Sequence, residues 1–362
     1  MKAKLHEKIT VILFCVFLIM MTLFYLVLPK VQFSQAEKRY LEEFPQITWR
    51  DVSSGKWGDS LEKYMADHIP GRNFWVGLNA YIDLYTGRQV TKDVWKIDSR
   101  LVEAPVKEND SAISSKMQSI NRFADIVDAT VDLAIIPSAG WATGASEYRD
   151  KAIIESIYTL ANADIQTIDM RSVFQSREDL YYATDHHWTS AGAYEAYSAY
   201  MTSVEKAYKS AEEFQVETIE GFQGSTYSRS ALWLTPSETI ELWKSDSQIS
   251  VTNGECTDIH QDVFYRERLQ EADKYTVYLD GNHSIVRTYN PNGSGKLLVV
   301  RDSFANCLGC FLAESYEEVV LVDLRYYKQP VSDLINQENF ERVLICYSLS
   351  NFIMDANLIF LK

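Results

Sequence analysis

The segment Leu297-Leu-Val-Val-Arg-Asp-Ser-Phe304 is a short apolar run that ends in a polar turn before a predicted helix. Two similar apolar runs, Val319 to Val322 and Val343 to Cys346, follow later, and helices fit between them. Short strands that are apolar throughout are typical of parallel sheets buried on both faces. The segment therefore predicts an α/β fold, with helices on both faces of a parallel sheet.

The same alternation of strands and helices starts earlier in the chain. We predict strands over residues 131–136 and 165–170, and helices over 111–127, 149–160 and 190–208. The last of these carries tyrosines and other apolar residues at helical spacing. These elements extend the predicted sheet to one large domain over residues 111–362.

Residues 214–292 differ from the rest of this domain. They are richer in Thr and Ser, and they contain turn signals at Asn253-Gly254 and Asp280-Gly-Asn282. We therefore expect a strand-rich insertion here. Residues 31–110 are expected to form a membrane-proximal collar, with helical character over 37–44 and 59–66.

Residues 9–28 form an almost uncharged apolar run, long enough to cross a bilayer as a helix. Lys2, Lys4 and Lys8 precede it, and Lys30 alone follows closely, so the N-terminus is expected in the cytoplasm. We predict that residues 1–30 form a cytoplasmic tip and a single-pass anchor, with the remainder extracytoplasmic. A cleaved signal peptide is the alternative, although no small-x-small cleavage site follows the run.

The formal net charge of −15 argues against nucleic acid as a partner, because phosphates require a basic surface. Five cysteines are present, and Cys307 and Cys310 form a C-x-x-C pair. Such a pair can be redox-active or bind zinc, but Cys256 and Cys346 do not supply further ligands at metal-binding spacing. Buried small side chains on a helix, or a disulfide, are the simpler interpretation, and we expect no cofactor.

Ser303 lies in the turn between a predicted strand and a helix, where a hydroxyl is exposed and helix N–H groups face a developing oxyanion. Alone, this pattern is equally typical of a helix N-cap. Asp185 and His187 stand two residues apart in Asp185-His-His-Trp188, so one carboxylate can hold one imidazole. A serine nucleophile needs such a base and orienting acid. A metal bound by Asp185, His186 and His187, with a further ligand at His283 or Asp302, is the alternative.

The stretch Tyr182-Ala-Thr-Asp-His-His-Trp-Thr-Ser-Ala-Gly-Ala-Tyr194 resembles the signature of the DHHW family. Further segments resemble it across the external part, namely 37–41, 67–72, 224–227, 301–306 and 322–327. The family resembles SGNH-hydrolase-like proteins with a circularly permuted motif order, including the alginate O-acetyltransferases. The resemblance implies Ser303 as nucleophile, His187 as base and Asp185 as its orienting carboxylate. Arg301 replaces a common glycine, so the turn is expected to differ.

Five other positions are weaker candidates for contacts to substrate or oxyanion. Asn282, with Gly281, lies in a turn and could donate to an oxyanion, and Asn351 is the competing asparagine. Arg325 could clamp a carboxylate or phosphate, or pair with Asp302 or Asp323. His186 is the remaining candidate, beside His187.

Together these features predict a membrane-anchored, extracytoplasmic serine O-acyltransferase that moves an acyl group, most simply acetyl, onto a cell-envelope polysaccharide. By resemblance, a polytopic membrane acyltransferase would supply the acyl group. A carbohydrate esterase would use the same residues. An inactive glycan-binding or assembly scaffold, and a metal-dependent hydrolase, are alternatives from other classes.

Overall fold

The computed structural model describes residues 2–88, 90–254 and 258–361. The chain divides into two compact units. One contains the residues up to Arg88 together with Ser228–Trp233, and the other contains the rest. We call the first the membrane-proximal unit, after the predicted collar and anchor that it contains, and the second the α/β unit.

The α/β unit is built on a seven-stranded sheet with the order β10-β11-β13-β12-β14-β6-β7. The five strands β13, β12, β14, β6 and β7 are parallel to one another. Strand β11 is antiparallel to both of its neighbours, β10 and β13. The strand bounds are β6 (Thr130–Ile136), β7 (Ile165–Ile168), β10 (Ser250–Asn253), β11 (Ile285–Tyr289), β12 (Lys296–Arg301), β13 (Glu318–Val322) and β14 (Arg342–Ser348). The predicted, mostly parallel α/β sheet is confirmed.

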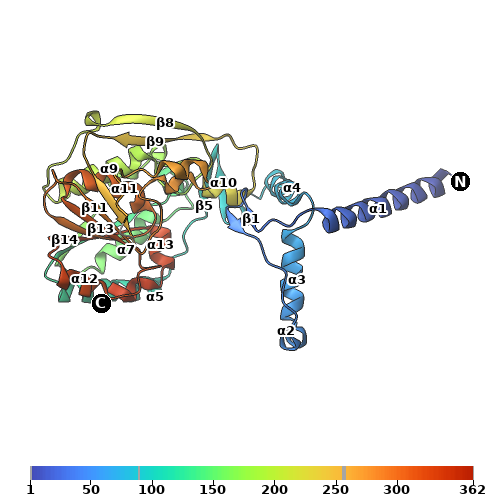
Figure 1. The fold of residues 1–362 in the computed structure, drawn as a ribbon, viewed down its shortest axis with the longest axis horizontal. Helices are drawn as coiled ribbons and strands as arrows, with labels where there is room; N and C mark the ends of the chain where they lie inside the picture. The colour runs from blue at the N-terminus through green and yellow to red at the C-terminus, as the bar shows by residue number, and fades with distance from the viewer. Residues whose placement is uncertain (1, 89, 255–257, 362) are drawn as a thin grey trace. The chain divides into compact units, whose positions relative to one another are not determined.

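Helices cover both faces of the sheet because each central strand is apolar on both sides (Figure 1). In β12, Leu297 and Val299 join one core cluster, and Leu298 and Val300 join the other. The first face carries α6 (Ala139–Ala142), α8 (Arg171–Phe174), α9 (Ser190–Ser203) and α11 (Phe304–Ser315). The second carries α5 (Asp110–Ile126), α7 (Asp150–Thr159), α12 (Val331–Gln337) and α13 (Leu349–Met354).

The direction in which the chain adds strands to the sheet reverses at β12. The chain leaves β12 through α11 to reach β13 on one side, then returns through α12 to β14 on the other side. In open α/β sheets, sites form at the carboxyl ends of the strands where the winding reverses. Ser303 follows β12 at this position.

Residues 214–292 contribute to two sheets. Strands β8 (Gln215–Phe222) and β9 (Glu238–Lys244) form a separate antiparallel ribbon, whereas β10 and β11 extend the main sheet. Helix α10 (Ser225–Ser230) lies between β8 and β9 in sequence. A small antiparallel sheet of β3 (Val90–Thr91), β4 (Val94–Ile97) and β5 (Arg100–Glu103) precedes α5.

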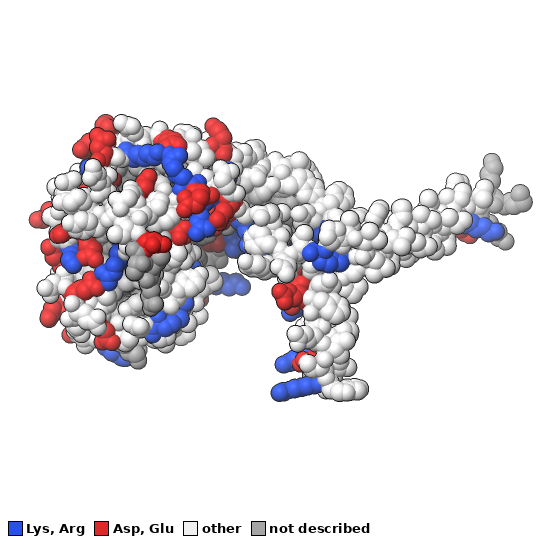
Figure 2. Space-filling view, in the orientation of Figure 1, with Lys and Arg blue, Asp and Glu red and all other residues white. Residues whose placement is uncertain are grey.

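The membrane-proximal unit begins with α1 (Lys2–Val27), whose segment Leu5–Val27 is long and apolar enough to span a membrane. It is a candidate single-pass anchor or signal sequence. Figure 2 shows α1 without charged side chains except near its N-terminal end. The remaining elements are β1 (Phe33–Ser34), β2 (Arg39–Tyr40), α2 (Trp49–Ser54), α3 (Lys56–Asp67) and α4 (Arg72–Tyr85).

Two predicted helices differ from the structure. The helix expected over residues 190–208 ends at Ser203, because Glu205 takes a left-handed conformation with φ of 54°. The helical character expected over 37–44 is wrong. Lys38 instead has φ of 51° in a tight turn, and β1 pairs with β2 around it.

Candidate active site

Ser303 lies between β12 and α11, and its hydroxyl does not cap the helix. The neighbouring Asp302 serves the helix end instead, since its Oδ1 accepts from the Phe304 N–H at 3.0 Å. The Ser303 Oγ is 2.8 Å from Nε2 of His187. Ser303 therefore occupies the N-cap position of α11, but its hydroxyl bonds to His187 and not to the helix.

His187 lies in the loop before α9, and the Thr189 side chain caps that helix. Its Nδ1 lies 2.5 Å from Oδ1 of Asp185. An ionised carboxylate can only accept, so Nδ1 carries the proton and Nε2 accepts from the Ser303 hydroxyl. The structure thus brings Asp185, His187 and Ser303 into one hydrogen-bonded chain, although 116 residues separate the last two.

Asp185 is fully buried and held by backbone donors. Its Oδ1 accepts from the His187 N–H at 2.9 Å, and its Oδ2 accepts from the Ser225 N–H at 2.5 Å. Burial raises its pKa, but the charges of the two neighbouring imidazoles and these hydrogen bonds outweigh burial and hold the pKa well below its usual range. Asp185 is therefore a carboxylate at neutral pH.

Gly224 permits this arrangement because it lies directly against Asp185. A Cβ on Gly224 would lie 2.2 Å from the Cβ of Asp185. Nearby, Glu238 of β9 accepts from the N–H groups of Ala183 and Thr184 at 2.8 and 2.7 Å, and from the Thr184 hydroxyl. The β8–β9 ribbon therefore fixes the loop that carries Asp185.

Trp188 connects the same loop to the helix that follows Ser303. Its side chain is fully buried, and its indole N–H donates to the Phe304 carbonyl at 3.1 Å. The His187 ring stacks on Tyr275 with centroids 3.9 Å apart and planes 6° apart. These contacts restrict the imidazole to the orientation that reaches Ser303.

Arg301 is fully buried at the end of β12 and has no positive φ, so the turn does not require glycine. Its Nη1 donates to Oδ1 of Asn306 and to Oδ1 of Asn282, the latter at 3.2 Å. Its Nη2 donates to the Gly281 carbonyl at 3.4 Å. Burial lowers the pKa of Arg301 to about 10, which leaves it charged at neutral pH.

Asn282 is exposed, and its Oδ1 also accepts from Nδ2 of Asn306 at 3.2 Å. Because Oδ1 already accepts from Arg301 and Asn306, the side-chain NH₂ of Asn282 is the group suited to donate toward a ligand. Asn282 and Gly281 are thus joined through Arg301 to the strand that carries Ser303.

Two other predicted positions have structural partners. Asn351 donates to Oδ2 of Asp302 at 2.9 Å, together with the Ser348 N–H and hydroxyl. Arg325 forms a bidentate pair with Asp323, with its closer contact at 2.6 Å. Of the two interpretations of Arg325, the structural ion pair is therefore the one observed.

His186 places Nδ1 2.5 Å from the Ser225 hydroxyl, and its ring packs against His187. Asp185, His186 and His187 are close enough to hold a metal ion. However, both ring nitrogens of His187 already have partners, so a metal would displace Asp185 or Ser303. The proposed extra ligands are also engaged, since His283 pairs with Asp280 at 2.8 Å and Asp302 with Ser348.

Cys307 and Cys310 are buried on α11 and are free thiols, as is Cys346, while Cys256 lies outside the described residues. Burial raises the pKa of Cys307 to about 12 and raises that of Cys310 well above its ordinary value. Reactive cysteines need a low thiol pKa. The interpretation of this pair as buried small side chains is confirmed.

Sequence reasoning missed the supporting residues Ser225, Glu238, Asn306 and Tyr275. The Gly224-Ser-Thr-Tyr227 segment gave a signal for the first, because it was among the stretches that resemble the family. Glu238 and Tyr275 gave none, since each resembles any other strand or turn residue of its type.

Residues 105–322 match the family model described as DHHW protein. Among solved structures, a DHHW family protein from Eubacterium siraeum is similar, with 21% identity, a TM-score of 0.66, and coverage of 75% of this chain and 95% of that chain. PatB1 from Bacillus cereus, carrying a sulfonyl adduct, has 20% identity and a TM-score of 0.63, with 74% and 98% covered. At such identities the two structures show a shared fold. No curated protein matches the chain in sequence.

Proposed function

The chain belongs to the DHHW family, and from this premise and its site we propose a membrane-anchored, extracytoplasmic serine O-acyltransferase. Its substrate would be a hydroxyl of a cell-envelope polysaccharide, and the transferred group would most simply be acetyl. One observation carries the proposal: the Ser303 hydroxyl donates to His187, whose other nitrogen is held by Asp185.

In the first half of the reaction, His187 Nε2 takes the Ser303 proton as Oγ attacks the acyl carbonyl of the donor. The resulting oxyanion would be stabilised by N–H groups at the start of α11 and by the Asn282 amide. The tetrahedral intermediate then collapses, the donor's leaving group takes the proton from His187, and the acyl group remains on Ser303.

In the second half, a sugar hydroxyl gives its proton to His187 and attacks the acyl-serine. Collapse of this intermediate breaks the bond to Ser303 Oγ, which recovers its proton from His187. The products are an O-acylated sugar and free Ser303. A polytopic membrane acyltransferase is the proposed source of the acyl donor, because α1 alone offers no path for export.

Release of p-nitrophenol from its acetate ester by the purified full chain tests the serine mechanism. We expect Ser303→Ala and His187→Ala each to lower kcat by about 1,000-fold or more. His283→Ala is the matched control, because it breaks a different Asp–His pair, and it should retain activity. Chelator should have no effect. A chelator-sensitive activity that survives Ser303→Ala would instead support the metal hydrolase.

Transfer and hydrolysis are separated by adding a polysaccharide acceptor during turnover. A transferase should move label from the acetyl ester onto the glycan, and the acyl-enzyme should accumulate when acceptor is omitted. An esterase would release free acetate at the same rate with or without acceptor. A scaffold would show no difference between wild type and Ser303→Ala under any of these conditions.

A further inference from the structure

An apolar niche of about 590 Å³ lies between α1 and α3 of the membrane-proximal unit. Met21 and Tyr25 line it from α1, and Leu61 and Met65 line it from α3. The reaction proposed at Ser303 does not use this niche. Its position on a helix that can span a membrane suggests what fills it.

The niche lies at a defined depth along α1. Met21 to Tyr25 belong to the apolar segment Leu5–Val27. At 1.5 Å rise per residue, they lie roughly 3–9 Å before the end of that segment. Interfacial helices bury their apolar faces to a similar depth, at the boundary between headgroups and acyl chains. If α1 spans the bilayer, the niche therefore opens onto lipid chains.

Helix α3 has the side-chain pattern of an interfacial helix. Gly58, Leu61 and Met65 line the niche at spacings of three and four residues, together with the exposed Glu62. Lys63 and Asp67 fall on the opposite side of the helix, as do Lys56 and Ser60. No residue of α3 is buried in the unit. Within the described residues, α1 therefore covers the apolar face of α3 only in part.

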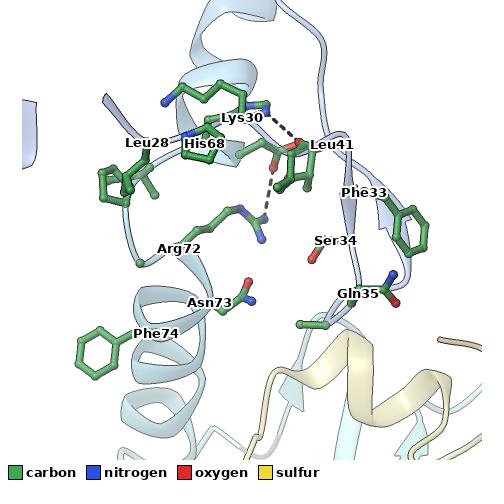
Figure 3. A pocket seen from close by; sticks show the side chains of 17 residues that line it. Leu28, Lys30, Phe33, Ser34, Gln35, Leu41, His68, Arg72, Asn73 and Phe74 are labelled. Carbon is green, nitrogen blue, oxygen red and sulfur yellow. Dashed lines mark hydrogen bonds and ion pairs between the residues drawn. The ribbon is translucent and has the colours of Figure 1, made fainter. Parts of the chain in front are cut away.

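A second pocket, of about 380 Å³, begins where α1 ends (Figure 3). Lys30, His68 and Arg72 lie around it, and Ile69 and Pro70 line both this pocket and the apolar niche. A polar pocket just beyond the apolar segment thus adjoins an apolar niche just within it.

The polar pocket has an excess of positive charge. Arg72 pairs with Glu37 at 2.7 Å and with Asp67 at 3.3 Å, and Arg39 also pairs with Asp67. Lys30 donates to the Tyr25 carbonyl at 2.5 Å. Of the residues that line the pocket, Lys30 and Arg72 are cationic and Asp67 is the carboxylate, so the lining carries one net positive charge, which favours an anionic headgroup.

We propose that the junction of α1 and α3 binds one anionic phospholipid. One acyl chain occupies the niche of Leu61 and Met65, and the headgroup phosphate occupies the pocket of Lys30 and Arg72. This proposal rests on the membrane anchor of the proposed function. It would fix the height of the membrane-proximal unit at the outer surface of the bilayer.

Native mass spectrometry of the full chain, released from micelles that contain phosphatidylglycerol as their one phospholipid, measures the bound lipid. We expect one retained lipid, and about fivefold less retention when phosphatidylcholine replaces it. Gly58→Trp should lower retention about tenfold, because a Cβ at Gly58 meets nothing within 4 Å and the indole would fill the niche.

Ser60→Trp is the matched control on the opposite side of the same helix, and it should retain the lipid. Equal retention by wild type and Gly58→Trp, with both folded by circular dichroism, would overturn the proposal. Equal loss in both variants would assign the apolar face to helix stability and overturn it as well.

Alkaline extraction of cell membranes distinguishes failure of the lipid site from failure of the membrane anchor. A protein that is released in shortened form has lost α1, and both the anchor and the lipid site then fail. A full-length protein that stays in the membrane but shows no difference between variants loses the lipid site alone.

Discussion

The two units of this chain differ in how far they bury their large apolar side chains. In the α/β unit, β12, which precedes Ser303, and its neighbours β13 and β14 are buried beyond their first residues, and helices cover both of their faces. In the membrane-proximal unit, α2 and α3 have no buried residue, and Trp49 is 88% exposed. Large apolar side chains are therefore inside in one unit and outside in the other.

This difference indicates what each unit depends on. The α/β unit satisfies its own core, so its site geometry follows from internal contacts such as those of Asp185 and Asp302. The membrane-proximal unit leaves apolar side chains exposed, and the proposed bilayer would cover part of them. Changes in the first should alter chemistry and stability, and changes in the second should alter membrane behaviour.

The largest effect should come from Asp185→Asn. The amide cannot hold His187 in the required tautomer, so we expect kcat for ester hydrolysis to fall by about 10²–10⁴-fold. Shape is retained, so KM should change little. Steady-state kinetics with p-nitrophenyl acetate measure both values. Retention of full activity would show that Ser303 is activated by another group.

Gly224→Ala should disturb the same carboxylate by sterics alone. The new methyl group would lie 2.3 Å from Oδ2 of Asp185, so either the loop or the carboxylate must shift. We expect a loss of about 1–3 kcal/mol in the free energy of unfolding, with activity reduced in parallel. Urea unfolding of the full chain in detergent measures the first. An unchanged urea midpoint would mean that Gly224 and the loop that carries Asp185 can move apart without loss of stability.

The pH dependence of stability should also reflect Asp185. Because its pKa is lowered in the folded state, its contribution is complete above the ordinary value of about 3.9 and is lost as pH falls toward the lower folded pKa. The difference in the free energy of unfolding between wild type and Asp185→Asn should therefore shrink as the pH falls below about 4. Asp179→Asn is the control, since the exposed Asp179–Arg177 pair contributes little. A difference independent of pH would contradict the assignment.

Trp188→Phe should have a smaller effect, because it removes one buried hydrogen bond and one ring of a fully buried indole. The Phe304 carbonyl loses its donor, which costs about 1–3 kcal/mol. Trp243→Phe provides the comparison, since its N–H donates to a partly exposed carboxylate, and we expect a smaller loss. Thermal unfolding of both variants tests this order, and the reverse order would contradict it.

The smallest effect should be Gly58→Ala in α3, and its sign should be opposite to that of Gly224→Ala. Nothing lies within 4 Å of the added methyl, and alanine favours a helix by about 1 kcal/mol relative to glycine. We expect slower amide exchange across α3 and no change in ester hydrolysis. Faster exchange would show that the open face of α3 is packed after all.

The sequence alone determined the strand β12 and its turn, because Leu297–Val300 is an unbroken apolar run before a polar dipeptide. It also determined the loop of Asp185 and His187, since their spacing is local and Thr189 caps the next helix. Periodicity and capping are properties of neighbouring residues, so they can be read without a fold. The same reasoning overextended α9, because the left-handed turn at Glu205 has no glycine to signal it.

Only the tertiary structure decided which polar side chains meet. Sequence favoured Asn282 and left Asn351 as its competitor, and the fold directs Asn351 to Asp302 while Arg301 holds Asn282. It likewise decided that Arg325 pairs with Asp323. Contacts between segments tens to hundreds of residues apart depend on how strands order in a sheet. That order follows from packing of the whole core, which no local pattern contains.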